Sequence, residues 1–250
     1  MKFKQQYTVK WHDTDANRQV TPSQIMMYLQ ETANIQLAKH AISLDELRDR
    51  NGLAFLLSSI SVCMYQPLYA HEQIEVQTWI GEGHGFSYNR YYSILKNGEP
   101  IVEAASVWAL MNLRDRRLLK ASEAPYRLDP DESLQLTTLP RRLRLPHTDG
   151  MELVGERKIV YSDIDYNGHM NNTHYANLFC DFTPESRNIR VTGMMFSFLH
   201  EAAYGEVLQV YRAQVEGGYV FRLIDPNGTV CTEAMLRTRP IENLQGKTHV

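Results

Sequence analysis

The chain has 250 residues, of which 43% are hydrophobic and 22% charged, and its formal net charge is -3 at pH 7. This length fits one large domain or two of ordinary size, and the apolar content is enough for a packed core. The charge balance argues against an intrinsically disordered chain and against a nucleic-acid-binding protein.

Several other classes are also disfavoured by the sequence. The three cysteines are scattered without a CxxC pair, which indicates reduced thiols in a cytoplasmic protein. The N-terminal segment lacks the apolar stretch of a signal peptide, and no apolar run reaches the roughly 18 residues of a membrane-spanning helix. Neither a glycine-rich phosphate loop nor a metal-ligand cluster is found, so we expect no cofactor and no metal.

An internal repeat organises the chain. The segment VKWHDTDANRQV (residues 9–20) matches IVYSDIDYNGHM (residues 159–170) at one fixed offset. Both segments begin like a strand and continue into a polar loop. The matched pairs are Trp11 with Tyr161, Asp13 with Asp163, Asp15 with Asp165, and Asn17 with Asn167.

A helix is predicted after each loop. In the first half Thr21 can cap the helix and Pro22 suits its first turn. One face of this helix is apolar, formed by Ile25, Met26, Leu29, Ala33 and Leu37. In the second half NNTHYANLFCDF predicts a shorter helix that ends before Pro184.

The remainder of each half predicts antiparallel strands. IEVQTWI and VLQVYR alternate apolar with polar residues. Asn97-Gly98 and Asp225–Gly228 are turn signals, and equal distances separate them from Glu103-Ala104 and Glu233-Ala234. Each half is thus predicted as strand, loop, helix, and then three or four long strands.

One amphipathic helix for each sheet predicts that the sheet wraps the helix and buries its apolar face. The expected fold class is α+β, a tandem (double) hotdog, with an antiparallel sheet around one central helix in each half. We place the N-terminal hotdog domain at 1–125, a proline-rich connector at 126–150 and the C-terminal hotdog domain at 151–250. A single mixed α+β domain with a chance repeat is the alternative.

The two halves differ at positions where chemistry can be placed. In the repeat alignment Gln19 stands opposite His169, whose imidazole can act as an acid or a base. Aligning Ile74–Val76 with Leu208–Val210 puts Pro67 opposite Glu201. A loop that was only structural would have little reason to gain an imidazole and a carboxylate together.

We therefore expect a catalytic site at Asp165, Asn167, His169 and Glu201. Glu201 could activate water or attack a carbonyl directly, and Asn167 and His169 could donate to the developing oxyanion. Asp165 could orient either of these two donors. The structural alternative is that Asp165 and Asn167 only hold an Asx-turn and that His169 is a satisfied polar group.

The segment YSDIDYNGHMNNTHYANLF resembles the signature of the plant and bacterial acyl-[acyl-carrier-protein] thioesterases. That family carries an Asp-x-Asn-x-His element followed by two Asn and a Tyr; the matching residues here are Asp165, Asn167, His169, Asn171, Asn172 and Tyr175. The family also has a Glu-Cys pair, which aligns with Glu201 and Ala202. Because Ala202 replaces the Cys, we expect Glu201 and not a thiol to carry the reaction, and we assign Cys180 to the core.

The resemblance implies hydrolysis of fatty acyl thioesters carried by acyl carrier protein, with the acyl chain held in the first half along Ile25, Met26 and Leu29. Two basic clusters could dock the acidic carrier: Arg114, Arg116, Arg117 and Lys120, and then Arg141, Arg142 and Arg144. Ordinary solvated charge is the alternative for both clusters. A nucleic-acid partner is not expected, and the sequence leaves a homodimer open.

Three other activities compete with this one. An acyl-coenzyme A thioesterase would use the same four residues on the same thioester bond. A hotdog dehydratase is disfavoured because the motifs of that family are not visible. A non-catalytic acyl-thioester-binding regulator would not need the second-half His169 and Glu201.

Overall fold

The computed structural model describes residues 2–126, 129–131, 136, 143, 145 and 150–241, so the predicted connector lies largely outside the described residues. In chain order the elements are β1 (Phe3–Thr8), η1 (Trp11–Asp13), α1 (Pro22–His40), α2 (Leu44–Asp49), β2 (Leu53–Met64), β3 (Gln73–Ile80), β4 (Tyr88–Lys96), β5 (Glu99–Asn112), β6 (Leu118–Leu119), η2 (Ala121–Glu123), β7 (Glu152–Lys158), η4 (Tyr161–Asp163), α3 (His174–Asp181), η5 (Ser186–Asn188), β8 (Ile189–Phe198), β9 (Val207–Val215), β10 (Gly218–Ile224) and β11 (Val230–Pro240).

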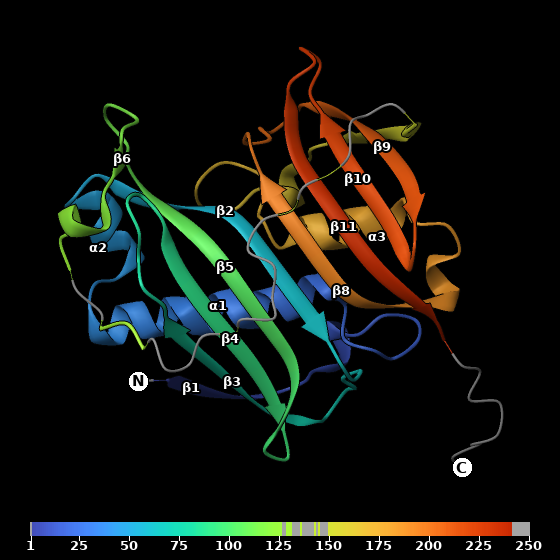
Figure 1. The fold of residues 1–250 in the computed structure, drawn as a ribbon, viewed down its shortest axis with the longest axis horizontal. Coiled ribbons are helices and arrows are strands. Elements are labelled where there is room, and N and C mark those ends of the chain that lie inside the picture. Colours follow the sequence, from blue (N-terminus) through green and yellow to red (C-terminus); the bar gives the residue numbers. More distant parts are fainter. Residues whose placement is uncertain are drawn as a thin grey trace.

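The strands of both halves form one antiparallel sheet (Figure 1). Its order is β1-β3-β4-β5-β2 in the first half and β8-β11-β10-β9-β7 in the second, so the second order mirrors the first. Strands β2 and β8 join the halves, with Ser59 opposite Ser197 and Val62 opposite Met194. The β2 edge of the first half and the β8 edge of the second half thereby cover each other, which protects these two edges from unwanted pairing.

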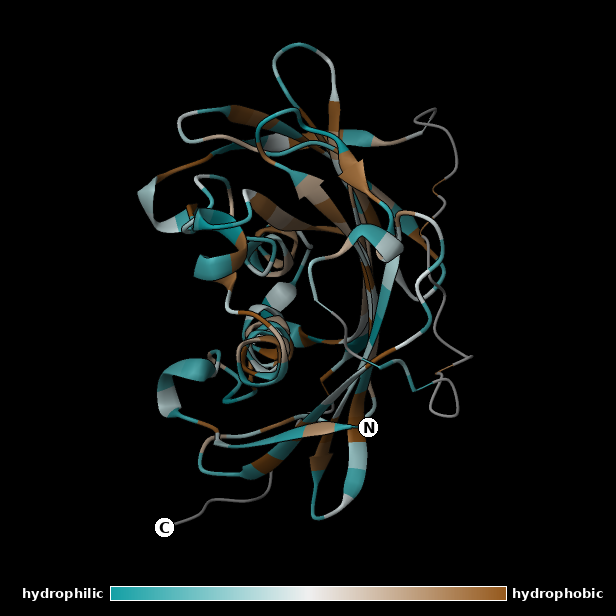
Figure 2. Ribbon diagram, turned by 90° about the vertical axis from the view of Figure 1, so that its left-hand side faces the viewer, coloured by the Kyte–Doolittle hydropathy of each residue, from teal (hydrophilic) through white to brown (hydrophobic). Residues whose placement is uncertain are grey.

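Helices α1 and α3 lie on the same side of this sheet (Figure 2). Helix α1 begins as predicted, because the Thr21 hydroxyl accepts a hydrogen bond from the Gln24 N–H at 3.2 Å and Pro22 occupies the first turn. Near this end α1 contacts α3: the Ser23 hydroxyl donates to the Thr173 carbonyl at 2.8 Å. Each helix therefore packs against its own half-sheet and against the other helix.

The core runs through both halves. Phe179 of α3 packs on Phe196 of β8 and Phe221 of β10, with ring centroids 5.9 Å and 4.9 Å away. All three rings are fully buried, and burial of such a side chain contributes roughly 1.5–3 kcal/mol. The same cluster includes Leu29 of α1 and Val76 of β3. A sheet wrapped around one helix in each half confirms the predicted tandem hotdog.

Local turn chemistry also follows the sequence. Asn97 and Gly98 both have positive φ, 54° and 84°, which is the backbone of the tight hairpin turn that connects β4 and β5. In the second half the Asp225 carboxylate accepts the N–H groups of Asn227 and Thr229 at 2.9 Å and 2.7 Å. These turns fix the strand register on which the alignment of the two halves depends.

Candidate functional site

The loop that carries most of the predicted site is a compact turn. The Asp165 N–H donates to the His169 carbonyl, and the Gly168 N–H donates to the Asp165 carbonyl, both at 3.0 Å. Gly168 has φ of 86°, a conformation that glycine adopts at low cost. The Asp165 carboxylate accepts the Asn167 N–H at 2.8 Å. Asp165 thus holds the turn from within, as an Asx-turn does.

The first half contains the same turn. The Asp15 carboxylate accepts the N–H groups of Asn17 and Gln19 at 2.8 Å and 3.1 Å, and the Asp15 N–H donates to the Gln19 carbonyl at 2.8 Å. Asp165 therefore has a structural task that its counterpart shares. The two loops differ chemically at the positions that the repeat does not match, and the main difference is that His169 replaces Gln19.

His169 and Glu201 form a close pair. The distance from His169 Nε2 to Glu201 Oε2 is 3.0 Å, and their side chains are 37% and 38% exposed. Short β-bridges connect His169 to Ala203 and Gln19 to Tyr69, so Glu201 and Pro67 stand at equivalent places two residues earlier. The structure therefore supports the sequence alignment that set Pro67 opposite Glu201. The pair remains open to water and to a substrate.

Ala202, at the position where the resembling family has Cys, faces away from this pair. Its side chain is 1% exposed and belongs to the hydrophobic core, and its carbonyl accepts the Met170 N–H at 3.0 Å. Burial raises the pKa of the Cys180 thiol to about 12 and that of the Cys231 thiol to about 11. A reactive thiol needs a lowered pKa, so neither is suited to be a nucleophile.

Two arginines of the first half reach the site, and sequence reasoning did not assign either a role there. Arg48 of α2 donates from Nη1 to Asn167 Oδ1 at 2.9 Å, and its guanidinium lies 5.0 Å from the Tyr166 ring centroid. Asn167 Nδ2 donates to Asp165 Oδ2 at 3.5 Å, and its second N–H can donate to a ligand. Arg116 places Nη2 3.7 Å from Glu201 Oε2, the oxygen that also faces His169.

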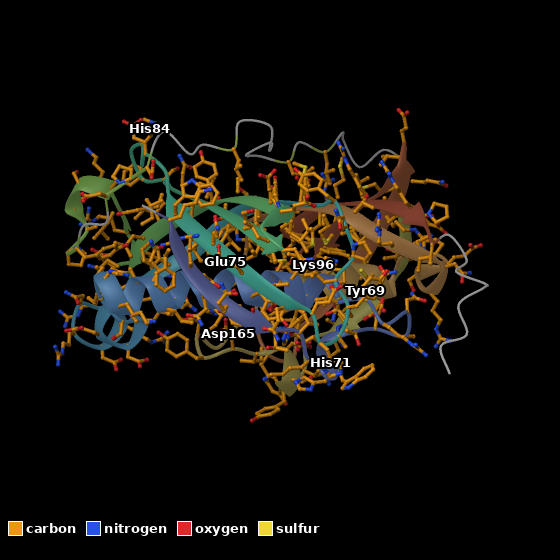
Figure 3. All side chains as sticks on the ribbon, turned by 90° about the horizontal axis from the view of Figure 1, so that it is seen from below. Tyr69, His71, Glu75, His84, Lys96 and Asp165 are labelled. Carbon is orange, nitrogen blue, oxygen red and sulfur yellow. The ribbon has the colours of Figure 1, made fainter. Side chains whose placement is uncertain are left out.

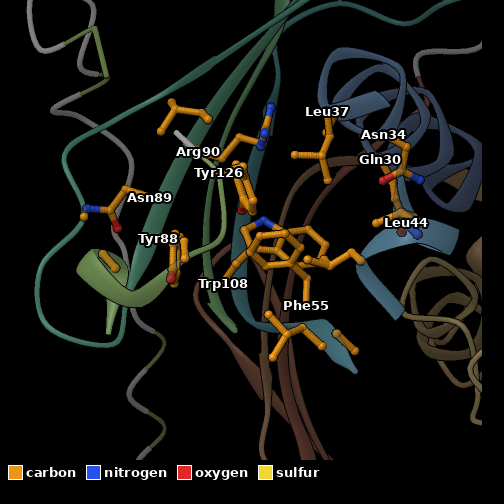
Figure 4. Close-up of a pocket in the computed structure, with 18 of the residues that line it drawn as sticks. Gln30, Asn34, Leu37, Leu44, Phe55, Tyr88, Asn89, Arg90, Trp108 and Tyr126 are labelled. Carbon is orange, nitrogen blue, oxygen red and sulfur yellow. The ribbon is translucent and has the colours of Figure 1, made fainter. Parts of the chain in front are cut away.

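A cavity of about 370 Å³ in the first half adjoins this loop (Figure 4). Its wall comes mainly from α1, α2 and strands β2 to β5, including Ala33, Leu37, Leu47, Phe55, Tyr88 and Trp108. Asp165, Tyr166, Asn167 and Asn172 of the second half also line it, whereas His169 and Glu201 are not among its lining residues. Figure 3 shows Asp165 on the side of the sheet that carries α1. The loop thus borders an apolar cavity that can hold a chain.

The three residues predicted to hold the acyl chain do not line this cavity, although Ile25 lines a second one, so their role stays a prediction. Ile25, Met26 and Leu29 are 3%, 2% and 1% exposed in the core, and none lines the 370 Å³ cavity. The reason is that the first turns of α1 pack against α3 and the sheet, which leaves only the later turns to face the cavity. The helical wall is formed by Gln30, Ala33, Asn34 and Leu37.

Each of the two loops lines a cavity together with residues of the other half. A second cavity, of about 270 Å³, is lined by Asp15, Asn17 and Gln19 of the first loop together with Cys180 and other residues of the second half. The Asn17 amide donates to the Arg187 carbonyl at 3.0 Å, which mirrors the contact between Arg48 and Asn167. The second-half loop therefore borders a cavity formed mainly by the first half, and the first loop lies at a cavity that both halves line.

The predicted basic clusters have different outcomes. Arg114, Arg116, Arg117 and Lys120 lie on and beside the β5–β6 hairpin, where Arg117 pairs with Glu123 at 3.1 Å. Arg141, Arg142 and Arg144 lie outside the described residues. Within the described ranges, no helix is long and apolar enough to cross a membrane.

Comparison with known proteins identifies a family. A family model of the acyl-ACP thioesterase N-terminal domain matches residues 1–126, and one of the C-terminal domain matches residues 149–237. An acyl-carrier-protein hydrolase of Cuphea viscosissima is 26% identical over 197 residues, which cover 73% of this chain and 47% of that protein. A palmitoyl-acyl carrier protein thioesterase of Arabidopsis thaliana is 23% identical over 267 residues, 98% of this chain and 63% of the relative.

Solved structures show the same fold. An acyl-ACP thioesterase from Bacteroides thetaiotaomicron superposes with a TM-score of 0.82 at 20% identity, covering 95% of this chain and 98% of that one. The 12:0-ACP thioesterase from Umbellularia californica gives 0.78 at 18% identity, covering 96% and 98%. Because the two family models together match most of the chain, the protein belongs to the acyl-ACP thioesterase family.

Proposed function

We propose that the protein hydrolyses fatty acyl thioesters carried by acyl carrier protein, with Glu201, His169, Asn167 and Asp165 as the catalytic centre. The observation that carries the proposal is the 3.0 Å approach of His169 Nε2 to Glu201 Oε2, at places where the first half has Gln19 and Pro67. Membership of the family supports the substrate class, and the adjoining apolar cavity supports an acyl chain as ligand.

Glu201, His169 and Asn167 each have a defined step in this proposal, and Asp165 holds the turn that carries Asn167. Glu201 accepts a proton from a water molecule while His169 holds the carboxylate in place, and the resulting hydroxide attacks the thioester carbonyl carbon. Asn167 Nδ2 donates to the oxyanion that forms, an arrangement favoured by Arg48 on the amide oxygen. The carbon–sulfur bond then breaks, and the proton held by Glu201 passes to the leaving thiolate, so fatty acid and free carrier thiol are released.

Direct attack by Glu201 on the carbonyl carbon is the other form of the same proposal. It expels the thiolate and gives an anhydride, which water then hydrolyses. Single turnover in oxygen-18 water detects direct attack when the anhydride is hydrolysed at the enzyme carbonyl, because oxygen-18 then enters Glu201. General-base catalysis leaves Glu201 unlabelled, as does hydrolysis of the anhydride at the acyl carbonyl.

The position of the basic hairpin supports a protein-bound substrate. Arg116 lies 3.7 Å from Glu201, so a carrier docked on this hairpin would present its thioester next to the candidate base. Acyl carrier proteins are acidic, and attraction between opposite charges accelerates such an association and weakens with salt. An acyl-coenzyme A substrate would use the same site without needing this surface.

The test is release of free thiol by the purified protein from acyl carrier protein and from coenzyme A, each loaded with the same series of acyl chains. We expect the carrier protein to be the better substrate, with a kcat/KM that falls as salt is added. Replacing Arg114 and Lys120 by Ala should raise KM for the carrier protein only. Equal efficiency with both carriers and no effect of salt would favour a coenzyme A thioesterase, and tight binding without turnover would favour a non-catalytic protein.

A further inference from the structure

A charged side chain lines the apolar cavity. Arg90 of β4 donates from Nη1 to Gln36 Oε1 of α1 at 2.5 Å and to Thr78 Oγ1 of β3 at 3.1 Å. Figure 4 shows it beside Tyr126 and across from Leu37, among the residues that line the cavity. Its guanidinium is therefore held on the wall of the space next to the Asp165–His169 loop, and not in bulk solvent.

The charge of Arg90 has no acidic partner within the part of the chain that the structure describes. Both acceptors are neutral side chains, and although Asp129 and Asp165 line the same cavity, neither forms an ion pair with Arg90 among the described residues. Burial lowers the pKa of this guanidinium, since an apolar surrounding disfavours the charged form. A cation in such a place is stabilised when a ligand supplies the missing acceptor.

The second half has no such group at the corresponding position. Arg90 pairs with Ser106 on β5, and Tyr219 pairs with Leu236 on β11. With Glu103-Ala104 matched to Glu233-Ala234, Ser106 corresponds to Leu236, and Arg90 therefore corresponds to Tyr219. The repeat can build this part of the sheet with a neutral aromatic residue, so the fold does not require the cation.

We propose that Arg90 selects acyl chains that carry a hydrogen-bond-accepting group away from the thioester, with a carboxylate as the best match. The planar guanidinium presents donors in a fork that fits the two oxygens of a carboxylate. The inference rests on the proposed thioesterase function, because Asp165 and Asn167 border the same cavity and would hold the thioester end. An acyl chain with only methylene groups next to Arg90 would displace water from the guanidinium without supplying a hydrogen-bond acceptor in its place.

The test compares two forms of each chain length on acyl carrier protein: one ends in a methyl group and the other in a carboxylate. The measured quantity is the ratio of kcat/KM for the carboxylate form to that for the methyl form. We expect Arg90→Met to lower this ratio at least about tenfold, as for loss of a charged hydrogen bond, and Arg90→Lys to retain part of it. Arg237→Met is the matched control, since Arg237 is an exposed strand arginine that does not line the cavity.

Equilibrium binding of free dicarboxylic and monocarboxylic acids to wild type and Arg90→Met adds a measurement that does not depend on turnover. Weaker dicarboxylate binding in Arg90→Met alone supports the inference. An unchanged ratio and unchanged binding in a protein that hydrolyses methyl-ended chains would overturn it while leaving the thioesterase function intact. Absence of hydrolysis with every thioester would overturn the thioesterase function, and the binding measurement would then decide the role of Arg90.

Discussion

Nε2 of His169 lies 3.0 Å from Oε2 of Glu201, although the two residues come from separate loops of the second half. The backbone that brings them together exists in both halves, because a β-bridge joins His169 to Ala203 just as one joins Gln19 to Tyr69. The same backbone arrangement thus occurs in both halves, but only the second half has an imidazole and a carboxylate at the two positions.

The first prediction concerns His169. We expect His169→Ala to lower kcat by about 10²-fold or more, because the Glu201 carboxylate loses the group that positions it. Folding should be unaffected, since the side chain is 37% exposed. Gln19→Ala is the matched control in the first loop and should retain activity. Thiol release and circular dichroism measure the two properties, and equal losses in both variants would speak against the assignment.

Ala202→Cys tests whether a thiol is needed. The Ala202 side chain is buried in the core and points away from the His169–Glu201 pair, so an added sulfur would lie outside the site. We expect kcat to change by less than about threefold, a difference below 1 kcal/mol in the barrier. A large gain in kcat that an alkylating reagent then abolishes would show that this position can contribute a nucleophile.

The cysteines give a prediction about pH. Burial raises the pKa of Cys180 to about 12, and a thiol stays protonated and unreactive at pH values below its pKa. Alkylating reagents at pH 7 should therefore leave thiol-release activity intact. Alkylation of Cys180, followed by mass spectrometry, should become faster as pH rises toward 12. Rapid inactivation at pH 7 that follows modification of one cysteine would contradict this view.

Arg48 is predicted to act through Asn167. Arg48→Met removes the donor that occupies Asn167 Oδ1 and leaves only the 3.5 Å hydrogen bond from Nδ2 to Asp165 Oδ2 to orient the amide, so Nδ2 is held less firmly toward the oxyanion. We expect kcat to fall roughly tenfold or more, with KM changed less, since a misplaced oxyanion donor affects the transition state above all. Arg48→Lys should restore part of kcat.

The same helix offers a control for Arg48. Arg50 is exposed and pairs with Glu46 one turn earlier, so Arg50→Met should leave kcat unchanged. A loss of kcat in Arg50→Met as large as that in Arg48→Met would indicate that α2 acts through its overall stability.

The sequence was sufficient for the fold and for the central pair, and the reason is the repeat. Matching Trp11 with Tyr161 predicted the element order of both halves, and the mismatch of Gln19 with His169 pointed to the copy that we propose to be catalytic. These inferences need only local patterns and one alignment. The structure adds that the mismatch of Pro67 with Glu201 is real, because both residues precede equivalent β-bridges.

The features that the sequence did not reveal depend on contacts between the halves. Pairing of β2 with β8 joins two half-sheets, and nothing in either strand specifies the other as partner. Arg48 reaches Asn167 only because the loop of each half contacts the other half. For the same reason the cavity begins at the later turns of α1, after Ile25, Met26 and Leu29 have packed into the shared core.

The most direct test is the thiol-release rate of Glu201→Gln with acyl carrier protein substrates at saturating concentration. Glutamine keeps the size of the side chain but cannot accept the proton of water or form an anhydride. We predict that kcat falls by about 10²-fold or more while circular dichroism and acyl-chain binding stay as in wild type. Wild-type kcat in Glu201→Gln would contradict the account, because no other carboxylate lies within ion-pair distance of His169 in the described part of the chain.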